Sequence, residues 1–173
     1  MDTTSSFISF TTRQAGDSEI LTALALLKSA ATTLQQKGID QWKIWLDPPA
    51  EKISWVEAGF AHGEFYFILI EDRIAGMYRL LAEDELYWGP QQVNAWYIHS
   101  LVILQEYSGQ QIGKRVLKQL INEASTRDIP LFRLDCNAAN KALCAYYESL
   151  GFKQVGVKQM PHSLNNLYEM ALS

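Results

Sequence analysis

Apolar residues recur at helical spacing in several stretches of this 173-residue chain. Between residues 17 and 37 they return every three or four positions, which predicts an amphipathic helix. Residues 111–127 show the same period with one clearly apolar face. Shorter helices are predicted over residues 50–61, after a pair of prolines, and over residues 140–150, before a glycine.

Runs rich in aliphatic and aromatic residues predict the strands. These strands cover residues 7–12, 64–71, 73–81, 93–104, 131–136, 152–157 and 166–172. The second and third read as an antiparallel hairpin, and one strand–helix–strand crossover follows later in the chain. The order predicts an α/β (α+β) fold: a mixed sheet of about seven strands flanked by helices on both faces.

Composition sets the domain organisation and the class of partner. With 48% hydrophobic and 20% charged residues, residues 1–173 suit a single compact domain. The net charge of -4 argues against a nucleic-acid partner, which needs a concentrated basic face. An acidic balance suits a cationic acceptor, although it is also ordinary for a soluble protein.

The two cysteines and the apolar runs bear on compartment and metal binding. Cys136 and Cys144 lack metal-ligand spacing with any histidine and form no disulfide framework. We therefore expect reduced thiols and no metal site. Residues 1–7 have neither the basic start nor the apolar core of a signal peptide. Apolar runs such as residues 65–70 are too short to span a bilayer, so a cytoplasmic protein without a membrane partner is expected.

A glycine-containing turn at residues 107–114 leads from a strand into a helix. Such a turn presents unpaired backbone N–H groups to an anion, and Gly109 and Gly113 let a ligand approach the backbone closely. Three basic residues crowd the first helical turns: Lys114, Arg115 and Lys118. The helix dipole disfavours cations there, and a bound polyphosphate would offset that effect. A structural turn with solvated basic residues fits the same pattern, and the ending of a Walker loop is absent.

The run from Tyr97 to Phe152 resembles the GNAT family, the Gcn5-related N-acetyltransferases. It carries a strand, the turn, an asparagine and then Tyr-x-x-x-Gly-Phe. The family signature Arg/Gln-x-x-Gly-x-Gly/Ala falls on Ser108, Gln111 and Gly113, so this sequence departs at the first two positions. A looser likeness extends upstream to residues 37–42.

This resemblance implies transfer of acetyl from acetyl-CoA to a primary amine of a small molecule or peptide, by direct attack in a ternary complex. Backbone amides of Leu101, Val102 and Ile103 would pair with the pantetheine and polarise the thioester carbonyl. The implied coenzyme contacts continue with Gly109, Gln110, Gln111, Ile112, Gly113, Lys114, Asn140 and Tyr147. Gln111 can donate from its backbone if its dihedrals are ordinary.

The resemblance also suggests the catalytic groups. It makes Tyr147 the general acid near the coenzyme sulfur, and it places the family's glutamate base at Tyr97. Strand alternation sets Tyr97, His99, Leu101 and Ile103 on one face, so His99 is a candidate base acting through water. A hydrogen-bonded core histidine, with a water chain in place of a base, is the competing interpretation.

Several assignments stay open at this level. Asn140 can cap the helix that follows it, contact the coenzyme, or do both, and Asn137 is an alternative turn residue. Six aromatic and acidic residues could form the wall that binds a cationic acceptor: Trp42, Trp45, Glu83, Asp84, Glu85 and Trp88. Alternatively, several of the tryptophans belong to the core and the acidic residues form a solvated loop. A non-catalytic CoA-binding regulatory module and a plain interaction domain are the alternatives to an enzyme. An edge strand near the C-terminus could form a homodimer.

Overall fold

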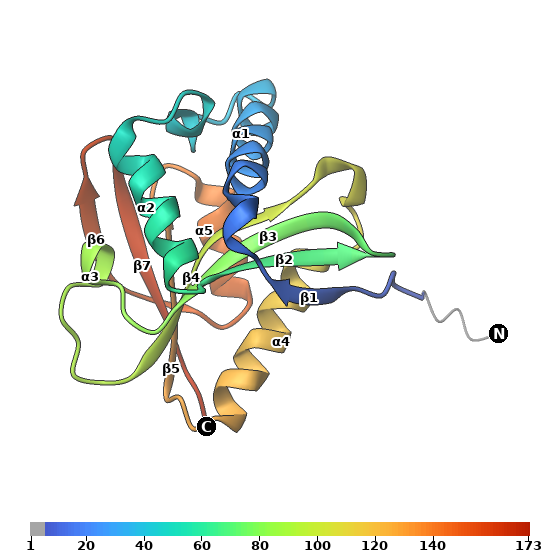
Figure 1. The fold of residues 1–173 in the computed structure, drawn as a ribbon. Helices are drawn as coiled ribbons and strands as arrows, with labels where there is room; N and C mark the ends of the chain where they lie inside the picture. Colours follow the sequence, from blue (N-terminus) through green and yellow to red (C-terminus); the bar gives the residue numbers. More distant parts are fainter. Residues whose placement is uncertain (1–5) are drawn as a thin grey trace. The chain divides into compact units, whose positions relative to one another are not determined.

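The computed structural model describes residues 6–173 of the chain. Its central element is a mixed β-sheet. Seven strands lie in the order β1-β2-β3-β4-β5-β7-β6 (Figure 1). Their bounds are β1 Thr11–Gln14, β2 Phe65–Ile70, β3 Arg73–Leu81, β4 Ala95–Ile103, β5 Leu131–Asn137, β6 Lys153–Met160 and β7 Ser163–Ala171. The pair β4–β5 is parallel, whereas β1–β2, β2–β3, β5–β7 and β6–β7 are antiparallel. The predicted mixed sheet and its crossover are confirmed.

The helices match the periodic stretches closely. They are α1 Ile20–Gln36, α2 Ala50–Ala61, α3 Glu85–Trp88, α4 Ile112–Thr126 and α5 Lys141–Ser149. Short 3-10 turns η1 (Asp17–Glu19), η2 (Lys43–Leu46) and η3 (Gln105–Tyr107) lie between them. The sequence did not predict α3, because a helix of one turn shows no apolar period. Instead the Asp84 carboxylate caps it, accepting from the N–H of Tyr87 at 3.3 Å.

The first strand begins later than predicted. Residues 7–10 do not join the sheet, and β1 starts at Thr11, opposite Leu69. The earlier segment is held by α4: Arg115 donates to the carbonyl oxygen of Ile8 at 2.7 Å and lies over the Phe10 ring. The signal-peptide prediction falls largely on residues 1–5, which lie outside the described residues. Within residues 6–173, no helix is long and apolar enough to cross a membrane.

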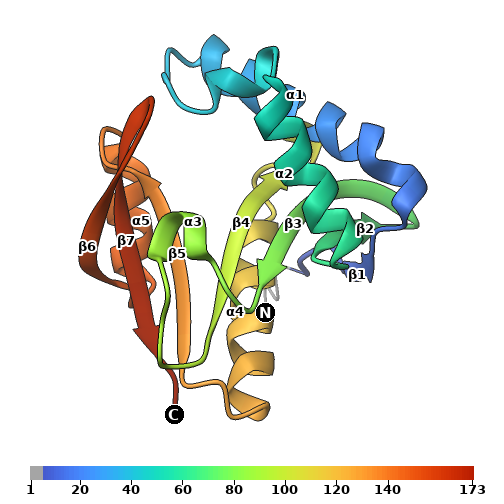
Figure 2. The same ribbon diagram turned by 60° about the vertical axis from the view of Figure 1, so that its left-hand side comes forward.

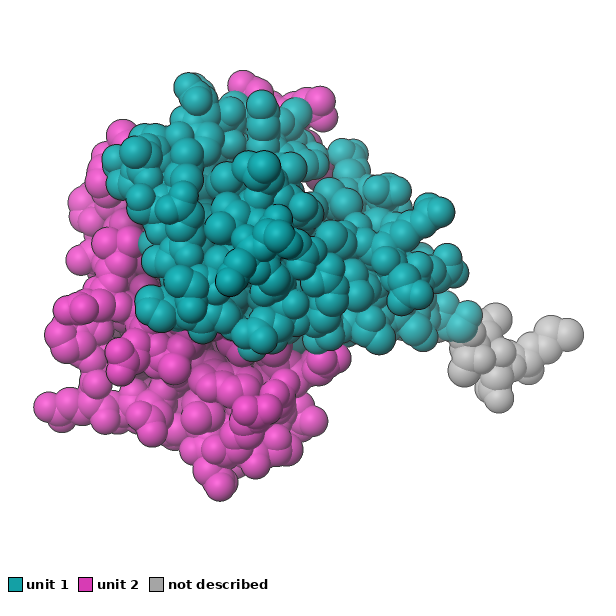
Figure 3. Space-filling view, in the orientation of Figure 1, with its two compact units in different colours: residues 1–33, 42–79, 100–116 teal, residues 34–41, 80–99, 117–173 magenta. Residues whose placement is uncertain are grey.

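The chain divides into two compact units (Figure 3). Unit 1 comprises residues 1–33, 42–79 and 100–116, and in it α1 and α2 cover β2 and β3 (Figure 1). Its core joins α1, α2, β2, β3 and Val102, with side chains such as Leu27, Val56, Phe67 and Met77 fully buried. Burial of this apolar surface is the main stabilising term for the unit. That residues 1–173 act as a single N-acetyltransferase domain stays a prediction.

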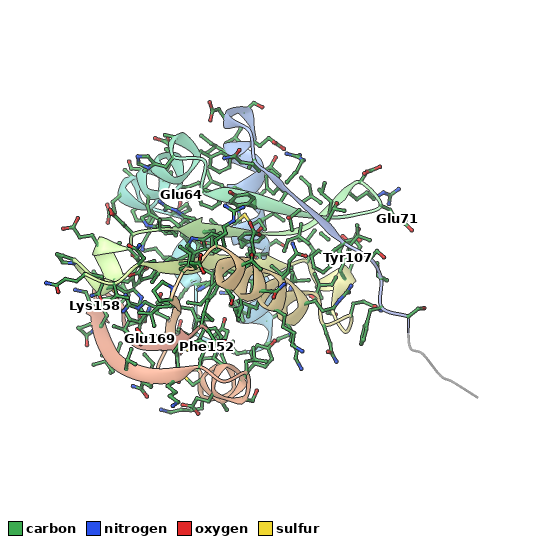
Figure 4. All side chains as sticks on the ribbon, turned by 90° about the horizontal axis from the view of Figure 1, so that it is seen from below. Glu64, Glu71, Tyr107, Phe152, Lys158 and Glu169 are labelled. Carbon is green, nitrogen blue, oxygen red and sulfur yellow. The ribbon has the colours of Figure 1, made fainter. Side chains whose placement is uncertain are left out.

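Unit 2 comprises residues 34–41, 80–99 and 117–173. In it α3 and α5 flank the β5–β7 part of the sheet (Figure 2). Alternation along β5 explains this arrangement: Arg133 lies under Trp88 of α3, whereas Cys136 contacts Cys144 of α5. Phe152, labelled in Figure 4, packs edge to face against Phe132 at 6.3 Å and against Tyr147 of α5 at 6.0 Å.

Candidate functional site

The turn before α4 leaves a row of backbone N–H groups available. The first bond of the helix runs from the N–H of Arg115 to the carbonyl oxygen of Gln111, at 3.0 Å. Within the described residues, no backbone carbonyl accepts from the N–H groups of residues 109–114. Gly109 and Gln111 have φ of +84° and +55°, a curved geometry that gathers N–H groups on one side.

Gln111 does not meet the condition of ordinary dihedrals. Its φ of +55° is left-handed, a conformation that costs a residue other than glycine about 1–2 kcal/mol. Gln111 therefore keeps the backbone shape that a glycine would adopt at this signature position. Replacing the signature glycine with Gln111 costs backbone strain, but the turn keeps the backbone conformation that a glycine would give it.

The basic residues at the start of α4 differ in their contacts and in their exposure to solvent. Arg115 is engaged with the N-terminal segment through Ile8, and its guanidinium also lies 5.5 Å from the Phe7 ring centre. Lys118 is exposed and Lys114 is half-buried. The two lysines therefore supply the positive charge that would favour an anion at this turn.

Strand β4 changes direction at Ser100, which has a φ of +54°. After it, Leu101 and Ile103 lie in contact range of Gly113, while Val102 is buried in the core of unit 1. The positive φ breaks the alternation of the strand. The prediction that Tyr97 and His99 share one face with Leu101 and Ile103 is therefore wrong beyond Ser100.

Gly76 of β3 is a functional candidate that the sequence did not reveal. A Cβ at Gly76 would overlap the carbonyl oxygen of Val102 and crowd Ile103. Only a glycine lets β3 approach β4 this closely. The position of residues 101–103 thus depends on a residue in another strand, and a lone glycine in a strand gives no signal of this role.

His99 lies between two carboxylates. Its Nε2 is 2.5 Å from Oδ2 of Asp84, and its Nδ1 is 3.5 Å from Oδ1 of Asp135. The three side chains expose 10%, 4% and 6% of their surface. The Tyr87 ring packs 4.8 Å from the imidazole. His99 and Asp84 were candidates from the sequence, whereas Asp135 was not, because only strand pairing brings it beside His99.

These three donors are close enough together to hold a metal ion. The carboxylates, however, approach opposite ring nitrogens. One ion can take only one nitrogen of an imidazole, so this arrangement suits hydrogen bonding of the ring better than shared coordination.

Tyr147 of α5 sits in an aromatic group with rings of Phe152 and Tyr168 at 6.0 and 6.2 Å. Burial raises the pKa of Tyr147 above its ordinary value, and the charge on Asp135 adds a smaller effect in the same direction. The phenol is therefore protonated at neutral pH. Among the described residues, no group forms a hydrogen bond with its hydroxyl, so that hydroxyl can serve a ligand.

Asn140 caps α5, as one of the two interpretations expected. Its Oδ1 accepts from the N–H of Leu143 at 3.1 Å, and its Nδ2 donates to Oε1 of Gln41 at 2.6 Å. Asn137 is also a turn residue, since its Oδ1 accepts from the N–H of Ala139 at 2.9 Å. The Asn140 amide keeps one N–H and one lone pair beyond these two bonds, and its contact with the coenzyme stays a prediction.

Two further groups are structural. The cysteines are free and buried, with their sulfur atoms 3.4 Å apart, and burial raises the pKa of Cys136. A thiol of this kind is a poor nucleophile. On the other side of β5, Arg133 donates to the Tyr97 hydroxyl at 2.7 Å and to Glu169 at 2.8 Å. Figure 4 labels Glu169. Tyr97, at the position of the family's glutamate, is therefore bound to a buried cation.

Residues 26–152 match the sequence profile of the acetyltransferase (GNAT) family. The chain belongs to this family. An uncharacterized N-acetyltransferase of Bacillus subtilis (strain 168), YesJ, is 26% identical over 145 residues, which is 81% of this chain and 78% of that protein. The ribosomal protein bS18-alanine N-acetyltransferase of Escherichia coli K12 is 31% identical over 62 residues, 36% of this chain and 42% of that protein.

Solved structures show the same GNAT fold. A GNAT acetyltransferase of Listeria monocytogenes superposes with a TM-score of 0.77 at 23% identity, over 95% of this chain and 96% of that one. The PaiA N-acetyltransferase of Thermoplasma acidophilum, solved with coenzyme A, gives 0.61 at 16% identity over 95% and 99%. The predicted GNAT family and fold are confirmed, and with them an acetyl-CoA-dependent N-acetyltransferase.

Proposed function

We propose that this GNAT protein transfers acetyl from acetyl-CoA to a primary amine of a small molecule or peptide, by direct attack in a ternary complex. The observation that carries the proposal is the hydroxyl of Tyr147, which is protonated and has no hydrogen-bond partner among the described residues. A proton donor of this kind is what a departing thiolate requires.

The turn at residues 109–114 has the donors that a pyrophosphate needs. Among residues 6–173, no backbone carbonyl pairs with its N–H groups, and the left-handed residues Gly109 and Gln111 curve the chain around them. In the proposal, the backbones of Gly109, Gln110, Gln111, Ile112, Gly113 and Lys114 bind the phosphates. Ile112 acts only through its backbone, since its side chain is buried.

Backbone groups of β4 would hold the acyl end. Strand β5 pairs with β4 at Ala95, Trp96 and Tyr97, so this ladder ends before Leu101. We assign the amides of Leu101, Val102 and Ile103 to the pantetheine and to the thioester carbonyl. A fixed N–H donor stabilises the negative charge that develops on that oxygen during attack.

Two side chains would move protons. Acetyl-CoA, when bound, supplies an activated acyl carbon. His99 takes the proton of the attacking amine through water as the new N–C bond forms, and the Tyr147 hydroxyl donates to the sulfur as the C–S bond breaks. The contacts of His99 with Asp84 and Asp135 support a role as a group that exchanges protons.

The proposal specifies that the acceptor has a primary amine and does not name the acceptor molecule. The Escherichia coli relative is named for an alanine of a ribosomal protein, and it matches 36% of this chain. A cytoplasmic location and a homodimer stay predictions. Edge strand β6 carries Val155 and Val157 with 53% and 55% of their surface exposed, which would suit pairing with a second copy.

A panel of alkylamines, polyamines and peptides with a free N-terminus, scored by release of coenzyme A thiol, tests this function. Turnover with at least one amine is the expected result. Binding of acetyl-CoA by calorimetry without turnover on any amine would favour the non-catalytic regulatory module. No binding at all would leave an interaction domain and overturn the proposal.

A further inference from the structure

The segment before β1, residues 7–10, lies against the start of α4. We infer that this segment, called here the N-terminal strap, holds the turn at residues 109–114 in the shape that binds the phosphates of acetyl-CoA, with Arg115 as the positioning residue. The inference rests on the coenzyme binding proposed above. The strap lies outside residues 26–152, the part of the chain that matches the family profile, so the family match does not describe it.

Two hydrogen bonds join the strap to both sides of the turn. The N–H of Ile8 donates to Oε1 of Gln110 at 3.4 Å, and the carbonyl oxygen of Ile8 accepts from the Arg115 guanidinium at 2.7 Å. Gln110 lies near the start of the turn. The backbone N–H of Arg115 makes the first hydrogen bond of α4, to the carbonyl oxygen of Gln111 at 3.0 Å. A single residue of the strap therefore contacts the chain before and after residues 111–114.

Two aromatic rings of the strap also contact the Arg115 guanidinium. Its Cζ lies 5.0 Å from the centre of the Phe10 ring and 5.5 Å from that of the Phe7 ring. The ring faces attract the cation, and its hydrogen bond to Ile8 is strengthened by its charge. Phe7 and Ile8 still expose 46% and 39% of their surface, so burial alone holds the strap weakly. Arg115 thus fastens the strap to α4 through one carbonyl oxygen and two rings.

The strap also explains how an arginine fits at the start of α4. The helix dipole disfavours a cation there, and the carbonyl oxygen and ring faces of the strap offset that effect for Arg115. Lys114 and Lys118 are left as the cations that attract the phosphates. Donors that are already held in place bind a ligand more tightly, because less conformational freedom is lost on binding. Loss of the strap contacts should therefore weaken acetyl-CoA binding and leave the reacting groups unchanged.

Phe10→Leu is the sharpest test, because it removes a ring that contacts Arg115 and changes no charge. We expect the Kd for acetyl-CoA, measured by calorimetry, to rise about threefold in Phe10→Leu and about tenfold in Arg115→Gln. The kcat at saturating acetyl-CoA should stay that of the wild type in both variants. The matched control is Arg127→Gln, because Arg127 also lies on the α4 side of a ring contact, 5.6 Å from the Trp96 ring centre, but at the end of the helix. Its Kd should not change.

A direct contact between Arg115 and a phosphate would also weaken binding in Arg115→Gln, and two results separate the roles. If Arg115 acts through the strap, Phe10→Leu combined with Arg115→Gln binds no more weakly than Arg115→Gln alone. Phe10→Leu should also keep the salt dependence of the wild-type Kd, since its charges are the same. Wild-type affinity in Phe10→Leu, beside weak binding in Arg115→Gln, would make Arg115 a phosphate ligand and overturn the positioning role.

Amide hydrogen exchange of the full chain without coenzyme tests the strap independently of binding. The backbone N–H of Arg115, bonded to Gln111, should exchange faster in Phe10→Leu than in the wild type, because the start of α4 is held less firmly. Arg127→Gln should leave this rate unchanged. An unchanged rate in Phe10→Leu contradicts the inference. If the rate rises as expected but the wild type does not bind acetyl-CoA, the strap holds the turn and only the proposed function fails.

Discussion

The α-carbon of Gly76 lies against the carbonyl of Val102 so closely that a methyl group does not fit between them. A residue of β3 thereby sets the position of the β4 segment to which we assign the thioester end of acetyl-CoA. A side chain at Gly76 would push residues 101–103 away, so this contact affects both the packing of the strands and the proposed binding of acetyl-CoA.

Gly76→Ala should therefore reduce both stability and coenzyme binding. Overpacking of a buried contact costs about 1–3 kcal/mol of unfolding free energy. The displaced strand should also bind acetyl-CoA at least tenfold more weakly. Thermal unfolding and calorimetry measure the two effects. Gly156→Ala is the matched control, since its Cβ would lie 3.8 Å from Leu167, an ordinary contact.

Gln111 allows the strain of the turn to be measured. Gln111→Gly relieves the left-handed conformation but raises the entropy of the unfolded chain, so unfolding free energy should change by less than about 1 kcal/mol. Affinity for acetyl-CoA should stay within about threefold, because the backbone shape is retained. Gln111→Val, with a branched Cβ at φ +55°, should lose more than about 1 kcal/mol. A more stable valine variant would contradict the assigned conformation.

The Arg13–Glu19 pair predicts a dependence of stability on acidity. Two contacts of 2.8 Å join the side chains, and the hydrogen bond from Arg13 lowers the pKa of Glu19 to about 2, with help from the N–H of Gly16. Because the folded pKa is depressed, this stabilisation is present above the unfolded value of 4.5 and is lost as pH falls toward 2.

Glu19→Gln should lower unfolding free energy by about 1 kcal/mol or less at pH 7, since the pair is partly exposed. Urea unfolding at several pH values checks this. The gap between wild type and variant should shrink steadily between pH 5 and pH 3. A gap that is constant over that range would mean that the charge on Glu19 does not contribute.

The long elements of the fold were predictable because each contains enough residues to show a period. Residues 111–127 revealed α4, and the predicted bounds of α2 match the structure. One-turn helix α3 and the positive φ at Ser100 gave no such signal. Both depend on single backbone conformations that tertiary contacts impose.

The candidate site shows the same division. The turn and Tyr147 could be proposed from the sequence because each lies in a short family motif of contiguous residues. Asp135 and Gly76 were missed because their roles depend on neighbours in other strands. Asp135 lies beside His99, which is 36 residues away in the sequence, and Gly76 lies beside Val102, which is 26 residues away. Strand alternation also failed at His99–Leu101, because a positive φ at Ser100 breaks the period.

The account as a whole depends on Tyr147 as the proton donor for the leaving thiolate. Tyr147→Phe removes one oxygen from the aromatic group and leaves the packing on Phe152 in place. The neighbouring Tyr146, which is 38% exposed, offers a matched control in Tyr146→Phe.

The most direct measurement compares these two variants with the wild type for release of coenzyme A thiol, with an amine acceptor from the panel, and for acetyl-CoA affinity by calorimetry. The prediction is a kcat about 100-fold lower in Tyr147→Phe, with acetyl-CoA affinity within about threefold of the wild type. Tyr146→Phe should match the wild type in both. Full turnover in Tyr147→Phe would contradict the account.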